Sequence, residues 1–298
     1  MEIQIIANEF YEHSLYFKGF SKATIKRYKY TIDLYLKLSK IRMISEITID
    51  NVRALFFQGR TTRKWSANTA IVFHKSLHVF FAWCLSKGYL NFNPINDIER
   101  PKIEEKLPKK LTKQEAIRLL EIVYNYPYID KFLRYRNHAI FSTFLFAGLR
   151  KSELLNLKYA DVDIENQTLF VQQGKGAKDR IVPISQTLAK SLSIYIKDRE
   201  RCKKTCPQFF TSLVQNTGLT EHGLKHFVDQ IQTVYPTRFT VHKLRHTFAT
   251  LMLEGGCDIY SLSRMLGHRD IKTTTIYLYA SAEHLRAQMI KHPLNQMI

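Results

Sequence analysis

The chain of 298 residues carries 45 Lys and Arg against 26 Asp and Glu, which gives a formal net charge of +19. Its length predicts two domains of ordinary size, and a hydrophobic content of 45% is enough for each to bury a core. A folded chain this basic repels itself, which indicates a polyanionic partner such as DNA, RNA or an anionic membrane surface. No apolar run approaches the roughly 20 residues that a membrane span needs, so a transmembrane protein is excluded.

The cysteines predict neither a disulfide framework nor a metal site. They are four in number and scattered, at Cys84, Cys202, Cys206 and Cys257. The sequence "CKKTC" has no second pair at the spacing of a zinc site, and no cluster of acids suggests a divalent metal. This usage fits reduced thiols in a cytoplasm.

The first ninety residues predict a small bundle of helices. Apolar residues recur at helical spacing through residues 21–38, 48–59 and 66–88. Ser21 and Thr48 stand where N-caps are expected. Basic residues crowd the other side of the first of these helices.

A linker is predicted next, at residues 94–110. This segment holds three prolines and a dense mixture of Lys and Glu with little apolar periodicity. We therefore expect a first domain at 1–93 and a second at 111–298, which includes a C-terminal tail.

The second domain predicts helices around a small β-sheet. Thr112 and Glu115 form a capping box, and Ile117 is among the apolar positions of the helix that follows. A buried helix, a break at Gly148 and a second helix come next. Two β-rich runs within residues 167–185 flank "GKGAK", which predicts a hairpin. Helical patterns then return, so the fold class is mainly α with a small antiparallel sheet.

Four later segments carry side chains that suit phosphate chemistry. They are "AGLRKSELLNL" with Arg150 and Glu153, "GKGAKDRIVPI" with Lys175, "HKLRH" with His242 and Arg245, and "LGHRDIKTTTIYLYA" with His268 and Tyr277. Each alone has an ordinary structural explanation, and "GKG" lacks the glycine frame of a P-loop.

Taken together and in this order, these residues resemble the tyrosine recombinase (phage integrase) family. Its pattern has an arginine in "GLR.SE", a lysine in a β-hairpin, "H.LRH", "LGH" and a nucleophilic tyrosine shortly after. The resemblance covers nearly the whole chain, and its C-terminal motifs are highly specific. It implies a helical, SAM-like domain that binds the core DNA site, followed by an α+β catalytic domain of the tyrosine recombinase type.

The chemistry explains the residue types. A phosphodiester under attack gains negative charge, so Arg150 and Arg245 should clamp the scissile phosphate while His242 and His268 add hydrogen bonds. A phenol is a better leaving group than an alkoxide, so a phosphotyrosyl bond keeps the energy of the cleaved linkage. A free 5′-hydroxyl can then attack that bond without ATP, and neither a metal nor a cofactor is needed.

The resemblance assigns the remaining roles. Tyr277 would form a 3′-phosphotyrosyl link, Lys175 would protonate the departing 5′-oxygen, and Glu153 would orient the cationic groups. Tyr279 is a rival nucleophile, because only the family register from His268 favours Tyr277. His246, which completes "LRH", is given a structural role.

Basic residues of both domains are expected to grip DNA. Most of them would contact phosphates and set affinity rather than sequence choice. The candidates are Lys22, Lys26, Arg27, Arg63 and Lys64 in the first domain, with Lys178 and Arg180 beside the hairpin in the second. Two domains joined by a linker suit a clamp around a duplex.

The sequence therefore predicts a site-specific DNA recombinase of the Xer or phage-integrase type. The resemblance implies a homo-tetramer on two double-stranded DNA sites, a Holliday junction, and a C-terminal segment that docks on a neighbouring subunit. A related recombinase as second partner, and the choice between chromosome-dimer resolution and mobile-element integration, stay open. We expect a cytoplasmic, nucleoid-associated protein. The alternatives are a type IB topoisomerase-like enzyme and a DNA-binding protein that has lost catalysis.

Overall fold

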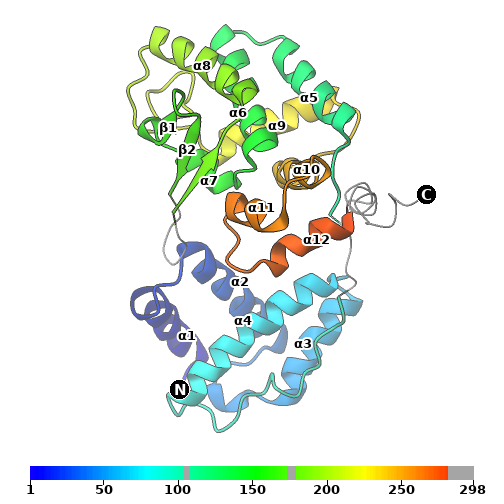
Figure 1. Cartoon of the computed structure of the whole chain (residues 1–298). Helices are drawn as coiled ribbons and strands as arrows, with labels where there is room; N and C mark the ends of the chain where they lie inside the picture. Colours follow the sequence, from blue (N-terminus) through cyan, green and yellow to red (C-terminus); the bar gives the residue numbers. More distant parts are fainter. Residues whose placement is uncertain (104–107, 173–178, 281–298) are drawn as a thin grey trace, which may run out of the picture. The chain divides into compact units, whose positions relative to one another are not determined.

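The structure is a computed structural model that describes residues 1–103, 108–172 and 179–280 (Figure 1). The chain divides into two compact units, Met1–Glu105 and Lys106–Ile298. Each unit has its own hydrophobic core, so each is described by itself.

The first unit is helical. Its elements are α1 (Ile3–Glu12), the π-helical turn η1 (His13–Phe17), α2 (Lys22–Ser39), the 3₁₀ turn η2 (Ile44–Glu46), α3 (Ile49–Thr61) and α4 (Ala67–Ser86). The predicted N-caps are confirmed, because Ser21 accepts from the N–H of Thr24 and Thr48 from the N–H of Asn51. These bonds satisfy backbone donors that the first turn of a helix leaves free.

Aromatic and aliphatic side chains of α1, α2 and α4 form the core of this unit. Phe10, Tyr35 and Phe80 are at most 1% exposed. Ile95 and Ile98, which we placed in the linker, are buried against the same core. His74 holds this segment through a hydrogen bond of 3.0 Å between Nε2 and the Ile98 carbonyl oxygen. The first unit thus extends beyond the boundary at residue 93 that the prolines suggested.

The second unit combines helices with a three-stranded sheet. Its elements are α5 (Lys113–Asn125), α6 (Lys131–Ala147), α7 (Lys151–Asn156), η3 (Tyr159–Asp161), β1 (Val162–Asp163), β2 (Thr168–Val171), β3 (Arg180–Pro183), α8 (Gln186–Arg201), α9 (Glu221–Val234), α10 (Val241–Glu254), α11 (Ile259–Leu266) and α12 (Lys272–Ala280). The predicted hairpin is confirmed as the antiparallel pair β2–β3. A short strand that the sequence did not reveal, β1, pairs with the outer edge of β2.

Helix α6 is the centre of the second unit, where it packs against α5, α8 and α10. The capping box at Thr112 and Glu115 is confirmed. The apolar face of α5 differs from the predicted one, since Ile117 is 48% exposed while Leu119 and Val123 are fully buried. The contact with α6 therefore buries a different face of α5 from the one that the sequence predicts.

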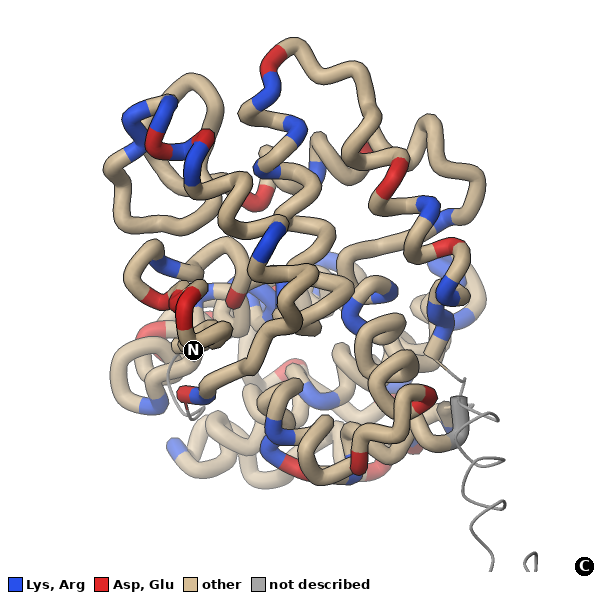
Figure 2. Tube along the Cα trace, turned by 45° about the horizontal axis from the view of Figure 1, so that its top comes forward, with Lys and Arg blue, Asp and Glu red and all other residues tan. Residues whose placement is uncertain are grey.

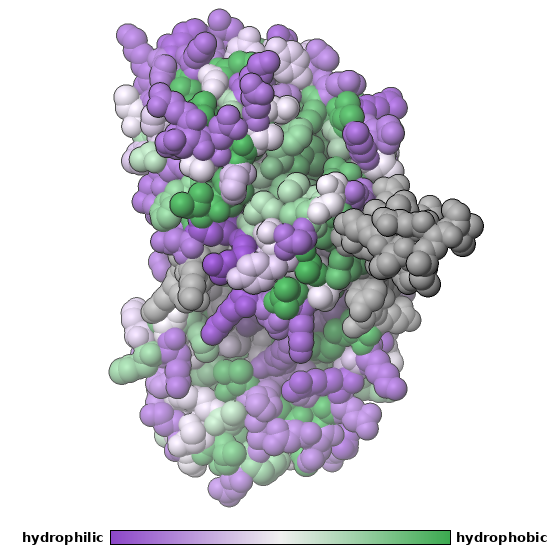
Figure 3. Space-filling model, in the orientation of Figure 1, coloured by the Kyte–Doolittle hydropathy of each residue, from purple (hydrophilic) through white to green (hydrophobic). Residues whose placement is uncertain are grey.

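Helices α10, α11 and α12 form a second, smaller cluster in this unit, and they pack against one another. Lys and Arg are spread along the traced chain in Figure 2, and hydrophilic side chains cover much of the face in Figure 3. In the described part of the chain, no helix is long and apolar enough to cross a membrane.

Candidate active site

The left-handed backbone conformation of Gly148 lets the chain turn so that Arg150 reaches the site. Gly148 ends α6 with φ of +60°, a conformation that glycine adopts without a steric cost. The chain then turns into α7, where Arg150 is the N-cap residue. Its guanidinium donates to the Glu153 carboxylate (Nη1 to Oε1, 2.6 Å) and to the carbonyl oxygen of Gly267 (Nη2, 2.8 Å). These bonds fix the direction of a side chain that is still 37% exposed.

The carboxylate of Glu153 is the anchor of the cationic groups. It accepts the N–H of Arg150 at 2.7 Å and two hydrogen bonds from Arg180 at 2.8 and 2.9 Å. Burial alone would raise its pKa, but the bonds and charges of Arg180 and Arg150 outweigh burial and lower the pKa to about 2. Glu153 is therefore ionised and orients two arginines.

Arg180 differs from its predicted role as a DNA contact. Its side chain is 8% exposed, and its Nε donates to the Met265 carbonyl oxygen at 2.7 Å. With both terminal nitrogens on Glu153, the guanidinium is used inside the protein. Arg180 is a positioning residue that ties β3 to the end of α11.

Arg245 lies deeper than Arg150 and is held by backbone oxygens. It extends from α10 and donates to the carbonyl oxygens of Gly148 and Leu266, both at 2.7 Å. Burial and the charge of Arg150 lower its pKa to about 10, so the guanidinium stays charged at neutral pH. An arginine fixed in this way can bind an anion without reorganising.

His268 lies beside these arginines and is itself neutral. Its Nε2 accepts from Nη2 of Arg245 at 3.2 Å, and its Nδ1 lies 2.7 Å from the hydroxyl of Thr274. Burial and the nearby arginines lower the pKa of His268 to about 4. With Nε2 as acceptor, the proton is on Nδ1 and the hydroxyl of Thr274 accepts it.

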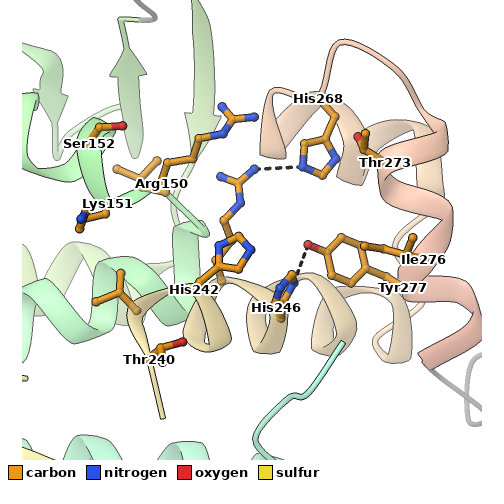
Figure 4. A pocket seen from close by; sticks show the side chains of 13 residues that line it. Arg150, Lys151, Ser152, Thr240, His242, His246, His268, Thr273, Ile276 and Tyr277 are labelled. Atoms are coloured by element: carbon orange, nitrogen blue, oxygen red, sulfur yellow. Dashed lines mark hydrogen bonds between the residues drawn. The ribbon is translucent and has the colours of Figure 1, made fainter. Parts of the chain in front are cut away.

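Tyr277 extends from α12 towards α10. It is 2% exposed and belongs to the cluster of α10, α11 and α12. Its hydroxyl oxygen Oη lies 2.9 Å from Nδ1 of His246 (Figure 4). Burial raises the pKa of Tyr277, and the charges of Arg245 and Arg150 offset only part of this rise. The side chain is thus a buried, protonated phenol in the wall of a cationic site.

One pocket brings most of the predicted catalytic residues together (Figure 4). It has a volume of about 600 Å³ and opens between α7, α10 and α12. The predicted residues that line it are Arg150, His242, Arg245, His268 and Tyr277. They come from separate segments of the chain, at residue 150, residues 242–245, residue 268 and residue 277, yet they face one cavity. A phosphodiester is the anion that such a set of donors suits.

Other predicted residues lie elsewhere. Lys175 and Lys178 fall outside the described residues. The cations expected to grip DNA in the first unit are all exposed, and they are Lys22, Lys26, Arg27, Arg63 and Lys64. The described residues contain no group of three or more His, Cys, Asp or Glu that could hold a metal ion.

His246, for which the sequence predicts a structural role, lies in the wall of the pocket. The sequence contained a signal for it. His242 and His246 are four residues apart in "HKLRH", a spacing that places side chains on one face of a helix. Their rings meet edge to face with centroids 4.3 Å apart.

Comparison with known proteins settles the family. The phage integrase family model matches residues 109–284, and the model of the phage integrase N-terminal SAM-like domain matches residues 7–89. The chain belongs to the phage integrase family. It is therefore a tyrosine recombinase, an enzyme of site-specific DNA recombination.

Relatives of this recombinase match along almost their whole length. Tyrosine recombinase XerC of Thermodesulfovibrio yellowstonii is 30% identical, over 98% of each chain. Tyrosine recombinase XerA of Thermococcus onnurineus is 34% identical, over 93% of this chain and 92% of its own.

Solved structures share the fold of this recombinase. XerH site-specific recombinase, bound to a palindromic difH substrate, matches with a TM-score of 0.72 and 22% identity over 89% of this chain and 79% of its own. A lambda integrase tetramer bound to a Holliday junction matches with a TM-score of 0.73 and 18% identity over 95% of this chain and 78% of its own.

Proposed function

We propose that this recombinase cleaves and rejoins DNA through a 3′-phosphotyrosyl bond, with Tyr277 as the nucleophile. The observation that carries the proposal is the pocket that brings together Arg150, Arg245, three histidines and the phenol of Tyr277. The scissile phosphate lies between the two guanidinium groups. The oxygen of Tyr277 attacks phosphorus, and the 5′-oxygen of the next nucleotide leaves.

The clamp acts on charge that develops during the reaction. Each nonbridging oxygen gains negative charge as the phenol oxygen approaches, and fixed donors stabilise that charge more than they stabilise the starting diester. Arg245 is almost fully buried and bonded to two carbonyl oxygens. Arg150 is more exposed and closes the open side. His242 adds a hydrogen bond to the same oxygens, and His268, whose Nε2 accepts from Nη2 of Arg245, holds that guanidinium in place.

Lys175 supplies the proton that the leaving 5′-oxygen needs. This role rests on the family resemblance and on its place in the "GKGAK" segment between β2 and β3. The reaction takes its positive charge from side chains and conserves the bond energy in the phosphotyrosyl link, so it proceeds without ATP or a metal ion. Rejoining is the reverse, with a 5′-hydroxyl as the attacking group.

The partners proposed are two double-stranded DNA sites and three further copies of the chain. Support for a tetramer comes from lambda integrase, whose structure is a tetramer bound to a Holliday junction. The exposed cations of α2, Lys22, Lys26 and Arg27, are proposed to contact phosphates of the DNA. An alternative assembly pairs two copies of this chain with two copies of a related recombinase. The biological roles that this reaction can serve are chromosome-dimer resolution and mobile-element integration.

A nicked suicide substrate tests the nucleophile. Cleavage close to the nick releases a short fragment that carries the 5′-hydroxyl. Because this fragment diffuses away, the strand cannot be rejoined and the covalent protein–DNA adduct accumulates. We expect the adduct with the unmodified protein and with Y279F, none with Y277F, and a modified peptide that contains Tyr277. An adduct that persists in Y277F would exclude Tyr277, and no adduct with any variant would indicate a DNA-binding protein.

The dependence on sites separates recombination from topoisomerase activity. We expect strand exchange to need two matched DNA sites. Relaxation of supercoiled DNA that carries no such site, at the same rate, would favour the topoisomerase-like alternative.

A further inference from the structure

We infer that His246 is the base of the cleavage step, which takes the proton from Tyr277 and returns it when the strand is rejoined. The inference rests on the proposed role of Tyr277 as the nucleophile. It assigns a chemical role to a histidine that the sequence motif alone does not distinguish from a structural one.

The first observation is geometric. Nδ1 of His246 lies 2.9 Å from Oη of Tyr277, which is the reach that a general base needs. His246 extends from α10 and Tyr277 from α12, and these helices pack against each other. In Figure 4 the phenol points at the ring of His246. The contact therefore comes from the tertiary packing of the second unit.

The second observation is that His268 and Glu153, two other groups that could accept a proton, are already bonded, while the recorded contact of the His242 ring is with His246. Both ring nitrogens of His268 are bonded, one to Arg245 and the other to Thr274. The carboxylate of Glu153 is bonded to Arg150 and Arg180. Guanidinium groups donate hydrogen bonds and do not accept them. Among the described residues that line the pocket, His246 is the group recorded in hydrogen-bond contact with the phenol.

The third observation concerns the protonation state of His246. Burial, together with the charges of His242 and Arg245, lowers its pKa to about 4. The ring is therefore neutral at neutral pH and has a lone pair to offer. A phosphodiester between Arg150 and Arg245 adds negative charge to the pocket and raises this pKa towards the value that proton acceptance needs.

The atoms balance in both directions. In cleavage, the bond between Oη of Tyr277 and phosphorus forms as the bond from phosphorus to the 5′-oxygen breaks. The phenol proton moves to Nδ1 of His246, and Lys175 gives a proton to the 5′-oxygen. In rejoining, the 5′-hydroxyl returns its proton to Lys175, and the imidazolium of His246 returns the other proton to the departing phenolate.

The test uses the full chain and single-turnover cleavage of the nicked substrate. General-base catalysis contributes about 10²- to 10⁴-fold, so we expect H246A to cleave at least about 100-fold more slowly than the unmodified protein, with unchanged DNA affinity. H246Q keeps a hydrogen-bond acceptor for the phenol but cannot take its proton. We expect H246Q to be nearly as slow as H246A.

A matched control is available in α6. His138 is also half-buried, and its Nδ1 lies 2.9 Å from the hydroxyl of Ser191. It lies outside the pocket, so H138Q should cleave at the rate of the unmodified protein. Thermal unfolding of each variant shows whether it is folded, and H246Q provides the answer if H246A is not.

A more acidic phenol gives a readout that a purely structural role would not move. With a fluorinated tyrosine incorporated at position 277, the nucleophile needs less help from a base. We expect the defect of H246A to shrink by about tenfold or more, following Brønsted behaviour. An equal defect with both phenols, or near-normal cleavage by H246Q, would overturn the inference while the adduct on Tyr277 stands. An adduct on another residue would instead overturn the proposed function, and the inference with it.

Discussion

Arg180 donates two hydrogen bonds to Glu153, from Nη1 to Oε1 at 2.9 Å and from Nη2 to Oε2 at 2.8 Å. Both side chains are less than 10% exposed. Removal of one partner of a buried pair leaves the other charge uncompensated, which costs about 3–5 kcal/mol. We therefore expect R180M to lower the free energy of unfolding of the second unit by a few kcal/mol, as measured by calorimetry.

An exposed pair in the same unit provides the control for this prediction. Lys225 and Asp229 are one turn apart on α9, and their side chains are 73% and 61% exposed. Such pairs contribute about 0.3–0.5 kcal/mol, so K225Q should unfold almost as the unmodified protein does. Equal losses in R180M and K225Q would contradict the anchoring role of Arg180.

Gly148 is predicted to be intolerant of a side chain. At φ of +60°, an added Cβ would lie 2.2 Å from Cδ1 of Phe248. Left-handed strain and overpacking together amount to about 2–5 kcal/mol, and the carbonyl oxygen that holds Arg245 would shift. We expect G148A to lower the unfolding temperature and the cleavage rate. G256A is the control, because Gly256 has φ of +89° but nothing within 4 Å of an added Cβ, so it should show the smaller loss of backbone strain alone.

The histidines of the pocket predict a stability that depends on pH. The pKa values of His246 and His268 are lowered to about 4, below the ordinary value of about 6.5. Between these values the unfolded chain binds more protons than the folded chain, so the free energy of unfolding rises with pH across this window. The stability that the neutral histidines contribute is therefore lost as pH falls from 6.5 towards 4. For such half-buried rings we expect a loss of the order of 1 kcal/mol each.

Unfolding temperatures at pH 5 and pH 7.5 measure this dependence. H268Q should show a smaller difference between the two pH values than the unmodified protein. His226 is an exposed histidine of α9, and H226Q should leave the difference unchanged. A difference as large in H268Q as in the unmodified protein would show that His268 does not titrate as its surroundings indicate.

The proposed acid, Lys175, can be tested apart from the base. A substrate with sulfur in place of the bridging 5′-oxygen has a leaving group that needs no proton. We expect K175A to cleave the normal substrate at least about 100-fold more slowly and to recover on the sulfur substrate. H246A should not recover there, because the phenol still has to lose its proton. Failure of K175A to recover would argue against its role as the acid.

The cations of α2 predict how DNA affinity depends on salt. Each phosphate contact contributes about 0.9 to the slope of log K against log salt concentration. K22Q and K26Q should each reduce the slope by nearly 1, measured by fluorescence anisotropy between 50 and 200 mM salt. K190Q is the control, because Lys190 is an exposed lysine of α8, which lies at the end of its unit away from α12 in Figure 1. An unchanged slope in both α2 variants would exclude these lysines as phosphate contacts.

The sequence by itself determined the helical character of both units, the caps at Ser21, Thr48 and Thr112, and the family. Caps are local, because a side chain three residues from a backbone donor satisfies it whatever lies elsewhere. The order of the arginine, histidine and tyrosine motifs is likewise written in the chain. The reactive groups of the pocket could therefore be named before their geometry was known.

Only the tertiary structure decided how those groups are held. The sequence predicts a DNA contact at Arg180, but β3 turns its side chain inward to Glu153. His246 appeared to be structural, but the packing of α12 on α10 sets it against Tyr277. The buried face of α5 was likewise chosen by its contact with α6. Long-range packing sets which of several equivalent side chains is buried, and no local spacing contains that information.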